Sequence, residues 1–190
     1  EGVHIYDVDN IGYVDYIGGG GSAIVGYANQ FILDAVRKVL VTGVPDGLHV
    51  PQEVELANAL SQMVPWAGSW WMCRNQDEAV RVFLRWVRMR TGRTTCLVLD
   101  GGRRLGAAVM PDAVGDGEGL TLIREVPGWD LEQIEATLVG GASKIAALVV
   151  DPLMTRLGVV EPPDGAIRRL AEVCRRVGIL LVFDERVTGF

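Results

Sequence analysis

Two short runs of uninterrupted apolar residues constrain the fold most strongly. Ile145–Val150 and Ile179–Phe183 contain only Ile, Leu, Val, Ala and Phe, and they end at Asp151 and Asp184. Strands with one wetted face alternate apolar and polar residues, whereas strands of a parallel sheet that is covered on both faces do not. Pro162-Pro163 are followed by apolar residues at helical spacing, which predicts a helix that begins at these prolines. These patterns predict a mostly parallel sheet with helices on both faces.

Helical and strand patterns alternate from about residue 51 to residue 190. We therefore predict an α/β fold in three layers, helix–sheet–helix. Ligands of such sheets bind beyond the carboxyl ends of the strands, so we expect any site to lie near these ends. Three other helices are expected: one that begins at Pro51, one from Asn75 or Asp77 to about Arg90, and one at Leu131–Leu138. The other expected strands are Trp70–Cys73, Thr94–Leu99 and Leu120–Arg124.

The first 50 residues have a different pattern. Val3–Asn10 and Tyr13–Ile17 alternate apolar and polar residues around a short turn, which predicts a hairpin. The glycine run Gly18–Gly21 follows, and then a helical pattern around Ile32–Leu40. We expect residues 1–50 to form a hairpin and helix segment, and residues 51–190 to form a large α/β domain that is incomplete.

The composition excludes several classes of partner. With 18 basic and 24 acidic residues, the net charge of −6 gives no basic field that would attract nucleic acid or an anionic membrane. No apolar run approaches the ~18 residues of a membrane span. The apolar content of 49% instead predicts surface that is buried in a homodimer or against a partner chain. Three widely spaced cysteines and two separated histidines predict no metal site and a cytoplasmic protein.

Short motifs follow one another in a recognisable order along nearly the whole chain. They are Asp7-Val8-Asp9, Tyr13–Ile17, Ile24–Ala28, Glu53–Ala57, Arg90–Arg93, Pro162–Gly165, Leu181–Glu185 and Thr188–Phe190. In this order they resemble the class III aminotransferases, and in particular glutamate semialdehyde aminomutase. The resemblance implies part of the large domain of the fold-type I architecture of pyridoxal-phosphate (PLP) enzymes, whose sites lie between two subunits.

A PLP enzyme needs a lysine that forms a Schiff base with the aldehyde. The resemblance places the family's lysine beyond the Thr188–Phe190 motif, outside this sequence. Only Lys38 and Lys144 are lysines here, and neither matches the motif. We interpret both as solvated surface residues.

The phosphate group needs donors at a helix N-terminus. Aligned on Glu78-Ala79, this chain has Asn75, Gln76 and Asp77 where the family has Ser-Gly-Thr. A carboxylate about 4 Å from a phosphate is repelled by about 4 kcal/mol for unit charges at an effective dielectric constant of about 20. We therefore interpret Asp77 as a helix cap and not as part of a phosphate site.

The pyridine ring needs flat apolar neighbours and a carboxylate for its nitrogen. In the family, an aromatic residue stacks on one face of the ring, and the resemblance places it within Asp100–Arg104, which contains no aromatic residue. An apolar residue covers the other face of the ring in the family, and this chain has Arg186 at that position. Asp184 is the one cofactor contact that the resemblance retains. Asn75, Gln76, Asp77, Arg103 and Arg186 are the candidates for a remodelled pocket.

Three functions remain open. The first is an aminotransferase-fold domain that has lost PLP chemistry, binds no cofactor and serves in binding, scaffolding or assembly. The alternative is a fragment or split part of a PLP-dependent class III aminotransferase or aminomutase. A second alternative is PLP-independent chemistry that uses Asp184, Arg186 and Arg103 as its polar groups.

Overall fold

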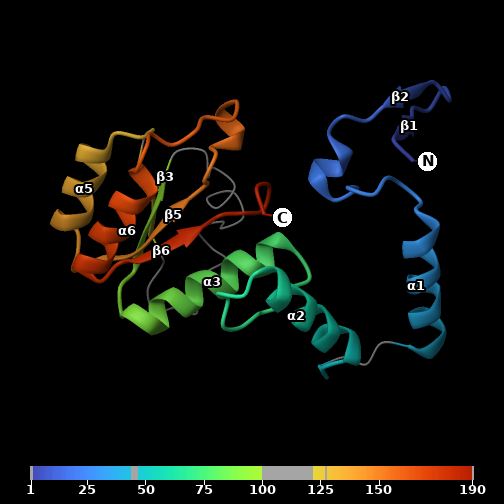
Figure 1. The fold of residues 1–190 in the computed structure, drawn as a ribbon, viewed down its shortest axis with the longest axis horizontal. Coiled ribbons are helices and arrows are strands. Elements are labelled where there is room, and N and C mark those ends of the chain that lie inside the picture. The colour runs from blue at the N-terminus through green and yellow to red at the C-terminus, as the bar shows by residue number, and fades with distance from the viewer. Residues whose placement is uncertain (1, 44–46, 100–121, 127, 190) are drawn as a thin grey trace. The chain divides into compact units, whose positions relative to one another are not determined.

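The computed structural model describes residues 2–43, 47–99, 122–126 and 128–189 (Figure 1). The chain separates into two compact units, Glu1–Trp70 and Trp71–Phe190. Helix α2 belongs to the first unit, so the compact units divide at a later residue than the predicted domains, 1–50 and 51–190. That domain boundary stays a prediction.

The first unit begins with the predicted hairpin. Strands β1 (His4–Tyr6) and β2 (Gly12–Val14) pair antiparallel, with His4 opposite Val14. Helix α1 (Gln30–Thr42) begins where the side chain of Asn29 accepts hydrogen bonds from two backbone N–H groups. Helix α2 (Pro51–Met63) has proline in its first turn, where the missing N–H costs no helical hydrogen bond. Neither helix contains a buried residue.

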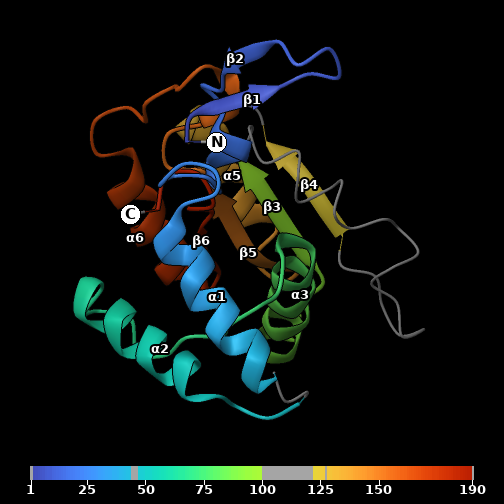
Figure 2. The same cartoon turned by 90° about the vertical axis from the view of Figure 1, so that its right-hand side faces the viewer.

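The second unit is built on a parallel sheet. Its strands lie in the order β4-β3-β5-β6, and each neighbouring pair is parallel (Figure 2). The strands are β3 (Thr95–Leu99), β4 (Leu122–Val126), β5 (Ile145–Val150) and β6 (Leu180–Phe183), and the helices are α3 (Gln76–Thr91), α5 (Leu131–Gly140) and α6 (Ala166–Val177). The predicted strands at 145–150 and 179–183 are therefore confirmed. The second strand begins one residue later than predicted, at Leu180.

The two faces of the sheet are buried against different helices. On one face, Leu84 and its neighbours in α3 pack with Val98 and Val149. On the other face, Ile134 of α5 and Leu170 of α6 pack with residues of β3 and β5. All six residues of β5 are buried, which is why its sequence shows no alternation. The predicted helix–sheet–helix layering is confirmed.

Two local predictions are wrong. Trp70–Cys73 has no strand partner among the described residues and is not a strand. The indole N–H of Trp70 instead donates to the hydroxyl of Ser61, 2.9 Å away. Helix α6 begins at Ala166, after Gly165 in a left-handed conformation (φ 75°), and not at Pro162-Pro163.

Candidate functional site

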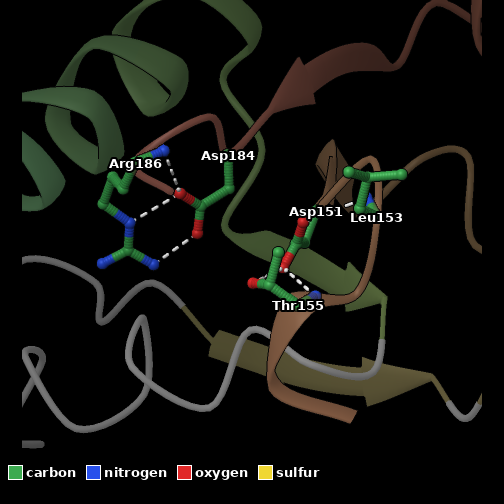
Figure 3. A network of polar contacts seen from close by, with 5 residues as sticks. All are labelled: Asp151, Leu153, Thr155, Asp184 and Arg186. Carbon is green, nitrogen blue, oxygen red and sulfur yellow. Dashed lines mark hydrogen bonds and ion pairs between the residues drawn. The ribbon is translucent and has the colours of Figure 1, made fainter. Parts of the chain in front are cut away.

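Two acidic residues lie at the carboxyl edge of the sheet. Asp151 follows β5 and Asp184 follows β6, and these strands are neighbours in the sheet (Figure 3). The backbone N–H of Asp184 donates to the carbonyl of Val150 at 2.8 Å, so the hydrogen-bond ladder continues beyond β6. The sheet thereby fixes the backbone of Asp184, as expected for a site residue of a parallel sheet.

Asp151 stabilises its own loop. One carboxylate oxygen accepts a hydrogen bond from the N–H of Leu153 at 3.2 Å. The other accepts from the N–H and the hydroxyl of Thr155, at 3.0 and 2.9 Å (Figure 3). These bonds hold the loop around Met154, whose φ of 40° is unusual for a residue with a side chain. Both oxygens of this buried carboxylate therefore have backbone or hydroxyl partners.

Asp184 forms an ion pair with Arg186. Nε of Arg186 donates to Oδ1 of Asp184 at 2.6 Å, and Nη2 of the same guanidinium donates to Oδ2 (Figure 3). The side chain of Asp184 is only 11% exposed and that of Arg186 is 29% exposed. Two parallel N–H···O bonds make this the strong, bidentate form of an arginine–carboxylate pair.

The turn after the ion pair is tight. The N–H of Gly189 donates to the carbonyl of Glu185 at 2.8 Å. A Cβ atom at residue 189 would lie 2.7 Å from that carbonyl oxygen, so only glycine fits without a shift of the turn. The hydroxyl of Thr188 is buried and has no hydrogen-bond partner among the described residues.

Helix α3 begins at Asn75 and presents a carboxylate in its first turn. The amide oxygen of Asn75 accepts from the N–H of Glu78 at 2.9 Å, and the carboxylate of Glu78 accepts from the N–H of Arg74 at 2.8 Å. This reciprocal arrangement resembles a capping box. Asp77 is exposed in the first turn and is not the cap, so that interpretation is wrong. The amide oxygen of Asn75 caps the helix instead. Gln76, the first helical residue, is half-buried.

The structure joins only part of the candidate pocket. It brings Asp184 and Arg186 into contact, and it places Asn75, Gln76 and Asp77 together at the start of α3. Arg103, together with the whole of Asp100–Arg104, lies outside the described residues. The prediction for this segment therefore stays a prediction.

Both lysines lie on the surface, as predicted. Lys144 directly precedes β5 and therefore lies at the amino edge of the sheet, opposite the edge of Asp184. Since parallel strands all end at the same edge, Lys144 and Asp184 lie at opposite edges of the sheet and cannot belong to one site.

No group of three potential metal ligands occurs among the described residues. His49 has one acidic neighbour. Its Nδ1 lies 2.8 Å from a carboxylate oxygen of Glu53, one helical turn later, but the imidazole is almost fully exposed. One carboxylate and one exposed histidine do not make a metal site.

Two polar interactions gave no signal in the sequence. Nη1 of Arg93 donates to the carbonyls of Ile145 and Gly178, at 3.1 and 2.7 Å. In the first unit, the hydroxyl of Tyr27 donates to Asp15 at 2.5 Å, and this bond lowers the pKa of Asp15 while the carboxylate raises the pKa of Tyr27. Both join residues that are distant in sequence, so residue spacing could not reveal them.

The residues at this edge do not fit PLP. The cofactor needs a carboxylate that is free to hold the ring nitrogen, but both oxygens of Asp184 are bonded to Arg186. The phosphate needs donors at a helix N-terminus, but α3 presents the Asp77 carboxylate there, and its cap uses an acceptor oxygen of Asn75. The ion pair at Asp184 and the carboxylate of Asp77 therefore both oppose the cofactor.

Comparisons with known proteins agree on the type of protein. No profile of a known protein family matches the chain. A glutamate-1-semialdehyde 2,1-aminomutase of Alkaliphilus oremlandii is 32% identical over an alignment of 206 positions, which covers 100% of this chain and 48% of the relative. A protein of the same name from Brevibacillus brevis is also 32% identical. The chain spans about half the length of the curated relatives it matches.

Solved structures agree as well. A glutamate-1-semialdehyde aminomutase from Pseudomonas aeruginosa has a TM-score of 0.80 at 27% identity, covering 98% of this chain and 44% of that chain. An omega-transaminase from Sphaerobacter thermophilus has a TM-score of 0.84 at 24% identity, covering 99% of this chain and 48% of that one, and shows the fold alone. The predicted resemblance is confirmed: over about half of their length, this chain is similar in sequence to the aminomutases and has the fold-type I architecture of class III PLP aminotransferases.

Proposed function

We propose that this chain is a fragment or split part of a class III protein of the aminotransferase or aminomutase type, whose chemistry requires segments outside these 190 residues. The observation that carries the proposal is the match over 100% of the chain but only 48% of the relative. The lysines support it, because Lys144 lies at the opposite edge from Asp184 and neither lysine matches the family's motif. A Schiff base would need a lysine from elsewhere.

The size of the native protein tests this proposal. The chain is isolated from its natural source with an antibody against residues 128–189, and its intact mass is measured. We expect a polypeptide roughly twice as long as this chain, in line with its 48% coverage of the relatives. A mature polypeptide of about 20.6 kDa would contradict the proposal.

A specific observation favours a second candidate function, which is binding or assembly on an aminotransferase fold without PLP chemistry. That observation is the bidentate ion pair between Asp184 and Arg186. Asp184 is the one cofactor contact that the resemblance retains, and both of its carboxylate oxygens accept hydrogen bonds from Arg186. We place such a protein in the cytoplasm as a homodimer. No described helix is long and apolar enough to cross a membrane.

The first unit supports an assembly role. Its two helices contain no buried residue, and Phe31, Leu40 and Val41 of α1 are 85%, 69% and 88% exposed. Apolar surface of this kind marks an interaction site in soluble proteins. A homodimer or another partner chain would cover it.

Two measurements on the complete protein test this second candidate. Light scattering after gel filtration gives the oligomeric state, and borohydride reduction after addition of PLP reports a Schiff base. We expect a dimer that takes up no PLP. A monomer would contradict the assembly role, and a PLP–lysine adduct would contradict the loss of PLP chemistry. PLP-independent chemistry through Asp184, Arg186 and Arg103 stays a prediction.

A further inference from the structure

We infer that Arg186 is the residue that excludes a pyridine cofactor from the carboxyl edge of this sheet. Its guanidinium takes the place beside Asp184 that a protonated ring nitrogen needs. This inference rests on the second proposed function, the loss of PLP chemistry, and names the side chain that determines it.

The pair is local and firmly placed. Asp184 is fixed by its N–H bond to the carbonyl of Val150, and Arg186 lies only two residues later in the same short segment. Its backbone N–H also faces Oδ1 of Asp184 at 3.4 Å. Because the competing cation is tethered to the chain, a cofactor in solution competes against a partner of high effective concentration.

The guanidinium is also the better partner chemically. A protonated pyridine offers one N–H to a carboxylate, whereas Arg186 offers two at once, to Oδ1 and to Oδ2. Arginine stays protonated at any physiological pH, so the pair cannot be opened by deprotonation of the cation. A pyridinium that entered beside Arg186 would be a second positive charge at the same carboxylate.

A displaced Arg186 would find no replacement at the neighbouring acid. Both oxygens of Asp151 already accept hydrogen bonds from the Leu153 and Thr155 groups. Displacement would leave a guanidinium that is 29% exposed without its carboxylate, which is costly for a partly buried charge. Discrimination against the wrong ligand through an unpaired charge is a common source of specificity.

The test uses pyridoxamine phosphate (PMP), whose amine needs no lysine and therefore probes the pocket alone. PMP binding to the complete protein is measured by equilibrium dialysis for four forms: wild type, Asp77→Thr, Asp77→Thr/Arg186→Val and Asp77→Thr/Arg169→Val. Asp77→Thr removes the repulsive carboxylate at the phosphate end, so that only the ring end differs among the variants. Arg169 is the matched control, since it is also an arginine in an ion pair, but its partner is Glu135 of α5 and not Asp184.

We expect the variant with Arg186→Val to bind PMP at least about tenfold more tightly than Asp77→Thr alone, while the Arg169 control gains nothing. If that variant is folded and binds PMP no more tightly than Asp77→Thr alone, the inference about Arg186 is wrong. The proposed loss of PLP chemistry is unaffected by that result as long as the wild type takes up no cofactor. If wild type holds PMP as tightly as the Arg186 variant, both are wrong. Should Arg186→Val fail to fold, Arg186→Gln keeps most of the stem, removes the charge, and must show the same gain.

Discussion

Replacement of Arg93 by methionine is expected to destabilise the second unit. Arg93 follows α3, and its Nη1 donates to the first residue of β5 and to Gly178 at the end of α6. One side chain thus joins three elements. Methionine keeps an unbranched apolar stem and removes the donors and the charge.

The magnitude follows from the two hydrogen bonds. A hydrogen bond that involves a charged group contributes about 1.5–3 kcal/mol. The two bonds of Arg93 share one nitrogen, and Gly178 is exposed, so that its carbonyl regains water in the variant. We therefore expect Arg93→Met to lower the free energy of unfolding by about 2 kcal/mol, close to one such bond and not to two.

Urea unfolding, followed by circular dichroism, measures the effect. Arg85→Met is the matched control, because Arg85 lies exposed on α3 and has no described partner. We expect the control to change the free energy of unfolding by less than about 0.5 kcal/mol. If Arg93→Met changes it as little as the control does, the two carbonyl contacts do not hold the unit together and the reasoning is refuted.

Two further predictions concern titratable groups. Burial raises the pKa of Cys96 and of Cys174 to about 11, and it also raises the pKa of Cys73, but Cys73 alone among the three is not buried. Near pH 8 we therefore expect only Cys73 to react with a disulfide reagent before denaturant is added. Labelling of Cys96 at the rate of Cys73 would contradict this. The Tyr27 hydroxyl holds the pKa of Asp15 below its ordinary value, so the contribution of this carboxylate to stability is present above the ordinary pKa and is lost as the pH falls through the lowered one. Tyr27→Phe should raise the pKa of Asp15 in an NMR titration, and an unchanged value would show that another group lowers it.

The sheet could be predicted because burial on both faces leaves a strong pattern. The runs 145–150 and 179–183 contain no polar residue, and the structure places them in β5 and β6. The start of α3 gave a weaker signal, because the sequence offers both Asn75 and Asp77 and only the structure shows that Asn75 is the cap. These features depend on neighbours within a few residues.

The segment 70–73 shows where such reasoning fails. Trp70 and Trp71 suit a strand by propensity, but a strand also needs a partner, and none is present among the described residues. Trp70 instead bonds Ser61, nine residues earlier. Pairing is a property of the fold and cannot be inferred from one apolar run.

The candidate site was predictable in composition but not in geometry. The sequence indicates that Asp184 ends a strand and that Arg186 replaces an apolar residue of the family. It does not indicate that Arg186 turns back onto Asp184 and bonds both oxygens. Arg186 lies within the turn after β6, in which the N–H of Gly189 donates to the carbonyl of Glu185. The role of Asp151 as a stabiliser of its own loop likewise required the structure.

This chain has the fold of class III aminotransferases, and we infer that Arg186 occupies the place of the pyridine ring beside Asp184. A crystal structure of the complete protein, grown with excess PLP, tests it most directly. We expect the Arg186 guanidinium to lie on both oxygens of Asp184, with no pyridine ring at the carboxyl edge of β5 and β6. A ring whose nitrogen lies on Asp184, with Arg186 turned away, would contradict it.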